Sequence, residues 1–90
     1  MAVYPMLQIF CDQNIPSALE FFGSWAHVTL FEGRELKNTD IQNADILLVR
    51  SVTKVNKKLL ENTAIKIVGS ATAGINHIDT QYLNEQNIFF

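Results

Sequence analysis

Short apolar runs alternate with polar and turn-forming residues along the chain. Continuous runs at 6–11, 45–49 and 65–68 and a mixed run at 27–31 predict four strands of the kind that a parallel sheet buries. Another apolar run begins at Ile88 and predicts a fifth strand. Polar residues follow each of the first four runs, so these strands are expected to be short.

Segments with apolar residues at helical spacing lie between these runs. Asn or Asp opens three of them, which predicts helices over 14–23, 56–61 and 79–85. The capping-box spacing at 39–42 predicts a short helix or turn. Strands and helices are therefore expected to alternate along the chain.

This alternation predicts an α/β fold, because parallel neighbours need a crossover between them. Right-handed crossovers then give a flavodoxin-like three-layer sandwich around a mainly parallel five-stranded sheet. Ninety residues suffice for one compact unit, so residues 1–90 are expected to form a single domain. The apolar ending at 87–90 predicts that this domain is truncated within its last strand.

Composition and charge narrow the class of function. Hydrophobic residues make up 48% of the chain and charged residues 18%, which favours a folded domain over a disordered segment. The net charge is −2 and the largest basic cluster is Lys57-Lys58, which argues against nucleic-acid binding. No stretch approaches about 18 apolar residues and no export signal opens the chain. We therefore expect no membrane span and a cytoplasmic location.

Cysteine and histidine are too sparse to predict a metal centre. The single cysteine, Cys11, cannot form an internal disulfide, and His27 and His77 lie far from it in the sequence. Cys11 closes a buried strand and is interpreted as inert packing. His77 precedes the last predicted helix and is interpreted as structural, with a role as a base as the weaker alternative.

Candidate ligand-binding residues follow the third predicted strand, where ligands of a parallel sheet bind beyond the carboxyl ends. Arg50 and Ser51 offer a guanidinium and a hydroxyl there, which suit a carboxylate or phosphate. In the alternative interpretation, Arg50 pairs with Asp12 or Asp45 and Ser51 caps the following turn.

The loop after the fourth predicted strand, 69–74, consists entirely of small residues. It lets a ligand approach backbone N–H groups and adds the hydroxyls of Ser70 and Thr72. The loop matches neither a Walker motif nor a G-x-G-x-x-G fingerprint. Small residues that only permit a tight turn against a helix are an equally favoured interpretation.

The segments 12–16, 50–56, 68–74 and 77–79 closely resemble the amino-terminal part of D-2-hydroxyacid dehydrogenases. The likeness is strongest to the members that oxidise 4-phospho-D-erythronate with NAD on the way to pyridoxal 5′-phosphate. It spans nearly the whole chain, and the run at 50–56 is its most specific part. Two residues depart from the pattern, because Gln13 stands where the family usually has Glu and Asn76 stands where Asp is common.

This resemblance implies a substrate-binding domain that precedes a nucleotide-binding domain. It places Ser51 and Thr72 at positions that hold a small phosphorylated hydroxyacid, and Ala73 and Gly74 where the backbone receives the substrate carboxylate. Arg50 is implied as a neighbour of the substrate. NAD and the catalytic groups belong to the other domain, so this chain is expected to hold no catalytic or cofactor-binding residue. The full-length enzyme is expected to be a homodimer.

Two alternatives remain open at this point. The first is another D-2-hydroxyacid dehydrogenase, such as one that acts on phosphoglycerate. The second, from a different class, is a stand-alone flavodoxin-like binding or receiver module. A receiver carries a phosphorylatable Asp after its third strand, whereas this chain has Arg50 and Ser51 there.

Overall fold

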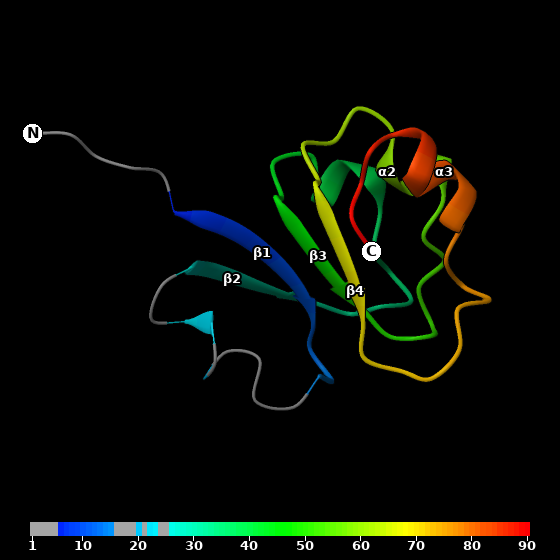
Figure 1. Cartoon of the computed structure of the whole chain (residues 1–90). Helices are drawn as coiled ribbons and strands as arrows, with labels where there is room; N and C mark the ends of the chain where they lie inside the picture. The colour runs from blue at the N-terminus through cyan, green and yellow to red at the C-terminus, as the bar shows by residue number, and fades with distance from the viewer. Residues whose placement is uncertain (1–5, 16–19, 21, 24–25) are drawn as a thin grey trace, which may run out of the picture.

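The fold is a parallel sheet, and the helical elements between residues 38 and 85 lie on one side of it (Figure 1). It is seen in a computed structural model that describes residues 6–15, 20, 22–23 and 26–90. The strands of the sheet are β1 (Leu7–Asp12), β2 (Ala26–Phe31), β3 (Ile46–Val49) and β4 (Ile67–Ser70). Half of the first predicted helix, 14–23, lies outside the described residues, namely 16–19 and 21, whereas Glu20 and Phe22 within it are helical.

Three short helical elements that connect or follow the strands are described over their whole length. They are the 3-10 helix η1 (Asn38–Asp40) and the α-helices α2 (Lys57–Leu60) and α3 (Thr80–Glu85). The side chain of Asn56 accepts a hydrogen bond from the backbone N–H of Leu59, at 3.1 Å. Asp79 accepts one from the N–H of Tyr82, at 3.0 Å. Both predicted caps are therefore confirmed.

The strands pair in the order β2-β1-β3-β4, and every pairing is parallel. This order is the first part of the flavodoxin-like order, so the predicted fold class is confirmed. The prediction of five strands is not met, because the fifth is reduced to one parallel bridge between Ile67 and Phe89.

The fourth strand begins two residues later than the apolar run predicts. Gly69 and Ser70, which were expected in a loop, pair with Leu48 and Val49 of β3. Ile65 lies before the strand yet is 5% exposed, because it packs into the core from the preceding segment. Burial of Ile65 therefore comes from packing outside the sheet.

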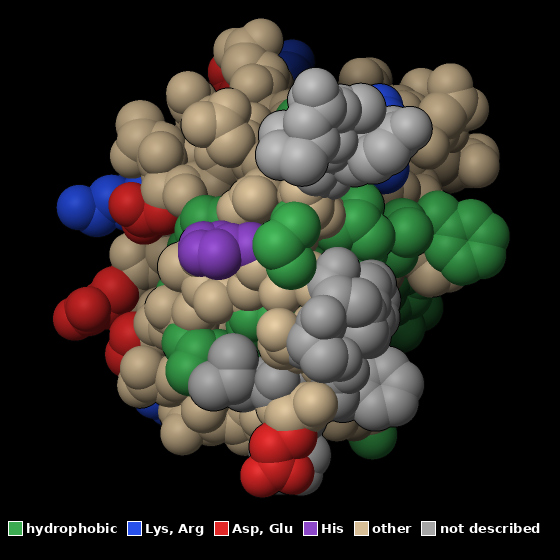
Figure 2. All heavy atoms as spheres, turned by 90° about the vertical axis from the view of Figure 1, so that its left-hand side faces the viewer, with side chains coloured by type: hydrophobic (Ala, Val, Ile, Leu, Met, Phe, Trp, Pro, Cys, Tyr) green, Lys and Arg blue, Asp and Glu red, His purple; other side chains and the backbone are tan. Residues whose placement is uncertain are grey.

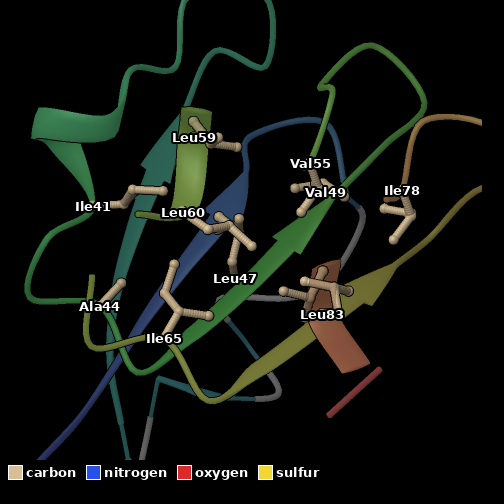
Figure 3. Packing of buried hydrophobic residues seen from close by; sticks show 11 residues of the cluster. Ile41, Ala44, Leu47, Val49, Val55, Leu59, Leu60, Ile65, Ile78 and Leu83 are labelled. Atoms are coloured by element: carbon tan, nitrogen blue, oxygen red, sulfur yellow. The ribbon is translucent and has the colours of Figure 1, made fainter. Parts of the chain in front are cut away.

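The main core lies between the sheet and the helices, as Figure 3 shows. Leu47 and Val49 of β3 and Val68 of β4 supply its sheet side. The remaining members come from the helices and connections, namely Ile41, Ala44, Val55, Leu59, Leu60, Ile65, Ile78 and Leu83. Each fully buried aliphatic side chain of this size contributes about 2 kcal/mol, so this packing holds the helices on the sheet.

The opposite face of the sheet is apolar but only partly covered by described residues. Ile9 and Cys11 of β1 are fully buried there, whereas Leu7, Leu30 and Ile67 keep 40% or more of their surface exposed. Figure 2, which looks at one side of the molecule, shows exposed apolar side chains gathered in a band. None of the helices in the described part of the chain has the length and apolar character needed to cross a bilayer.

Candidate functional site

The predicted ligand-binding residues gather at one edge of the sheet. All strands run in the same direction, so the turn after β3 and the loop after β4 emerge together at the carboxyl edge. Figure 1 shows these two connections side by side beyond the strand ends. The parallel topology thus brings together Ser51 and the loop 71–76.

A cavity of about 320 Å³ opens between these two connections. Among the predicted residues, Ser51, Ala73 and Gly74 line it. Three further residues complete the lining, namely Lys54, Asn76 and His77. The sequence did not lead us to predict Lys54 as a member of the site. Its position three residues after Ser51, in an irregular segment, was the signal that could have indicated it.

Gly74 presents open backbone to this cavity. Its φ angle is +85°, a left-handed conformation that favours glycine, and nothing lies within 4 Å of the place where a Cβ would stand. A ligand can therefore come close to the main chain at this position. The loop is open to solvent rather than packed tightly on a helix, which favours the ligand-binding interpretation of 69–74.

Arg50 is tied to the end of β1 instead of lining this cavity. Its Nε lies 3.1 Å from Oδ1 of Asp12, an ion pair that lacks the geometry of a hydrogen bond. Asp12 is fully buried, whereas the Arg50 side chain keeps a quarter of its surface exposed. The pairing of Arg50 with Asp12 that was expected as an alternative is therefore present. Asp45, the other expected partner, instead accepts a hydrogen bond from the backbone N–H of Gln8.

The buried carboxylate of Asp12 organises the turns around it. Oδ1 accepts a hydrogen bond of 2.8 Å from the backbone N–H of Asn14, while Oδ2 has no hydrogen-bond partner among the described residues. Gly33 packs directly against Oδ2, and Thr53 donates a hydrogen bond of 2.8 Å to the carbonyl of Gly33. The turns after β1, β2 and β3 are thus held to one another at the carboxyl edge of the sheet.

Thr72 lies beside the cavity in a network of polar side chains. Its Oγ1 lies 3.3 Å from Oγ of Ser70, which in turn lies 2.8 Å from Nε2 of His77. All three residues are partly buried. Sequence reasoning treated His77 as a structural residue and gave no indication of its contact with Ser70, seven positions earlier.

A second cavity, of about 430 Å³, adjoins the site on the side of α2. No carboxylate of the described residues lines this second cavity. Its lining includes four cationic side chains, namely Arg34, Lys37, Lys54 and Lys58. Lys54 lines both cavities. The edge of the sheet that carries the candidate site is therefore flanked by positive charge in a chain whose net charge is −2.

Cys11 does not join the site chemistry. The side chain is fully buried, and burial, followed by the nearby Asp12 carboxylate, raises the pKa of the thiol. A protonated, inaccessible thiol is a poor nucleophile. In the described ranges, no group of three His, Cys, Asp or Glu side chains is arranged to hold a metal ion.

Comparison with known protein families identifies the family of the chain. Residues 9–90 match the family model of the D-isomer specific 2-hydroxyacid dehydrogenase catalytic domain. The chain belongs to this family. The resemblance seen in segments 50–56 and 68–74 is therefore confirmed.

Curated relatives within the D-2-hydroxyacid dehydrogenases are similar over almost all of the chain. Erythronate-4-phosphate dehydrogenase of Hahella chejuensis is 51% identical over 93% of this chain. The enzymes of the same name from Marinomonas sp. and Salinibacter ruber are each 48% identical over 93% of this chain. The matched segment is 22%, 22% and 21% of these three relatives, so the chain spans about a fifth of their length.

A solved structure supports the same fold. A D-isomer specific 2-hydroxyacid dehydrogenase, NAD-binding, from Polaromonas sp. JS6 66 superimposes with a TM-score of 0.72. The match covers 94% of this chain and 29% of that protein, at 14% sequence identity. At this identity the likeness concerns the fold, and it agrees with the family assignment.

Proposed function

We propose that residues 1–90 form the amino-terminal substrate-binding domain of an NAD-dependent dehydrogenase. The enzyme would oxidise 4-phospho-D-erythronate to 2-oxo-3-hydroxy-4-phosphobutanoate in pyridoxal 5′-phosphate biosynthesis. The observation that carries this proposal is the cavity shared by Ser51, Ala73 and Gly74. It lies at the carboxyl edge of the sheet, in a chain that is about half identical to erythronate-4-phosphate dehydrogenases.

The residues of the site suit an anionic substrate. Ser51 is exposed and offers a hydroxyl, and the backbone at Ala73 and Gly74 is open to close approach. Lys54 supplies positive charge in the lining of the cavity, whereas the charge of the neighbouring Arg50 is paired with Asp12. A carboxylate or phosphate gains charge-assisted hydrogen bonds from such donors, which orient the molecule as well as bind it.

Hydride transfer is assigned to a part of the enzyme outside these residues. NAD, when bound, takes the hydride from the hydroxyl-bearing carbon of the substrate. The four glycines of this chain, at 23, 33, 69 and 74, do not form the G-x-G-x-x-G turn that holds a dinucleotide, so the present residues do not fit NAD. The proposal therefore gives this chain the task of holding substrate in a cytoplasmic, homodimeric enzyme.

Kinetics of the full-length enzyme test the substrate. We expect kcat/KM for 4-phospho-D-erythronate to exceed that for 3-phosphoglycerate, measured by NADH formation. Turnover of 3-phosphoglycerate alone would replace the proposal with the phosphoglycerate alternative. Turnover of neither compound would contradict both.

The variant Ser51→Ala tests the site in the same enzyme. Removing the hydroxyl should lower kcat/KM for the preferred substrate about tenfold, as expected for one lost hydrogen bond to a charged group. Thr39→Ala removes an exposed hydroxyl from η1, away from the cavity lining, and should leave kcat/KM unchanged. Equal kinetics for Ser51→Ala and the wild type would place the substrate elsewhere.

A further inference from the structure

The loop that joins β4 to α3 is fixed at both ends by backbone hydrogen bonds. At its start, the N–H of Ala71 donates to the carbonyl of Val49, at 2.9 Å. At its end, the N–H of Val55 donates to the carbonyl of His77, and the N–H of Asp79 donates to the carbonyl of Val55, both at 2.8 Å. Between these anchors, residues 71–76 are exposed except for the partly buried Thr72.

Side chains tie the two ends of this loop together. Nε2 of His77 lies 2.8 Å from Oγ of Ser70, the last residue of β4. The same Oγ lies 3.3 Å from Oγ1 of Thr72. These distances form a chain of three polar groups that runs from His77, through Ser70, to the candidate substrate-binding residue Thr72.

The chemistry of an anion fixes the direction of this chain. An ionised carboxylate or phosphate oxygen only accepts hydrogen bonds, and a hydroxyl has one proton to donate. If Thr72 donates its one proton to such an anion, its contact with Ser70 can be a hydrogen bond only with Ser70 as the donor. Ser70 then has no proton left for His77, so its oxygen must accept from an N–H at Nε2 of His77. The opposite direction would point the lone pairs of Thr72 at a negative charge.

We propose that His77 is a positioning residue for substrate binding, and this rests on the proposed function. Its Nε2–H donates to Ser70, and Ser70 donates to Thr72. The proton of the Thr72 hydroxyl is thereby directed at an acidic oxygen of the substrate. His77 acts through Ser70, so it needs no contact with the reacting atoms. Its tautomer, with the proton on Nε2, determines whether Thr72 donates or accepts.

The position of the proton can be measured in enzyme saturated with inorganic phosphate as the bound anion. In full-length enzyme labelled with ¹⁵N-histidine, the His77 signals are assigned by their loss in His77→Gln. We expect a protonated Nε2 in the folded enzyme. A bare Nε2, with the proton on Nδ1, would overturn the proposed direction. This measurement separates the two proposals, because it holds whichever hydroxyacid the enzyme oxidises.

Kinetics test the consequence for the substrate that the enzyme turns over best. His77→Leu removes the donor while keeping an apolar side chain of similar bulk, and KM should rise about tenfold with kcat within about twofold. His77→Gln keeps a donor at the end of the side chain and should recover most of the affinity. An unchanged KM in His77→Leu, or equal losses in both variants, would overturn the role of the donor.

A double variant distinguishes positioning from general loss of packing. Thr72→Val removes the hydroxyl that His77 is proposed to orient, so adding His77→Leu should raise KM no further. Independent, multiplicative increases would show that His77 acts by another route and would overturn the proposal. If His77→Leu fails to fold, the tautomer measurement on the wild-type enzyme and the kinetics of Ser70→Ala decide the same question. Ser70→Ala should raise KM as His77→Leu does, and an unchanged KM would overturn the proposal.

Discussion

Gly33 is packed closely between the turns that follow β1 and β3. A Cβ at this position would collide with Oδ2 of Asp12 and would lie 2.7 Å from Cγ2 of Val52. Gly33→Ala should therefore lower the free energy of unfolding by about 2 kcal/mol, because buried neighbours must move. Urea unfolding of the chain measures this change.

Gly74→Ala is the matched control for that substitution. Its φ of +85° makes a side chain strained, but no atom lies within 4 Å of the new Cβ. The cost should be about 1 kcal/mol, from backbone conformation alone. A Gly33→Ala chain as stable as the Gly74→Ala chain would show that the turn around Asp12 is looser than its contacts indicate.

Cys11 should resist thiol reagents in the folded chain. The side chain is fully buried and its pKa is raised, so both access and the thiolate fraction are reduced. We expect an aromatic disulfide reagent to label Cys11 in the folded chain at least about a hundredfold more slowly than in the urea-unfolded chain. The ratio of the two rates is the reciprocal of the fraction of folded molecules that are locally open at Cys11. Equal rates in the two states would contradict the burial of β1.

The same raised pKa has a consequence for stability. Folding favours the neutral thiol of Cys11. The contribution of this thiol to the free energy of unfolding is therefore fully present below the thiol pKa of the unfolded chain. That contribution is lost as the pH rises through the higher pKa of the folded chain. Stability should therefore decline on the alkaline side, and a Cys11→Ala chain should lack this part of the decline.

At the scale of elements, the end of α3 offers a stabilising substitution. Asn87 follows the helix with a φ of 57°, and the N–H of Ile88 donates to the carbonyl of Leu83 at 2.8 Å. Glycine adopts this conformation without strain, so Asn87→Gly should raise the free energy of unfolding by about 0.5 kcal/mol. Gln81→Gly, at an exposed position in the first turn of α3, should lower it by a similar amount. Thermal unfolding checks the opposite signs.

Local signals made α2 and α3 predictable, whereas η1 begins at Asn38 with Lys37 as its N-cap, ahead of the capping box predicted at 39–42. Asn56 and Asp79 were correctly identified as caps because a cap bond joins residues three positions apart. The strands were less well defined, since Gly69 and Ser70 enter β4 only through their pairing with Leu48 and Val49. That pairing joins residues about twenty positions apart, and no local pattern specifies its register.

The candidate site was predictable to the same extent. Ser51 and Gly74 line a common cavity, in keeping with the rule for parallel sheets, and Ala73, which the resemblance implied, lines it too. The bond between Ser70 and His77 depends on the path of a six-residue loop, which small, weakly patterned side chains do not determine. Arg50 was an expected donor to a ligand, and its pairing with Asp12 was the alternative that the fold realises.

At the scale of the whole molecule, the 90-residue chain should lack dehydrogenase activity and bind NAD negligibly. Its glycines form no dinucleotide fingerprint, and its site offers donors for a small anion only. Isothermal calorimetry with NAD measures this directly, with the full-length enzyme as the positive control. Saturable heat from the isolated chain would show that these residues contain a nucleotide site.

The strand order β2-β1-β3-β4 also bears on how the protein is made. A ribosome releases β1 first, after which β2 joins one side of it, β3 joins the other, and β4 adds beyond β3. Each strand finds a free edge when it emerges, and none has to insert between two strands that are already paired. The sheet can therefore grow outward during translation, without undoing pairs that have formed.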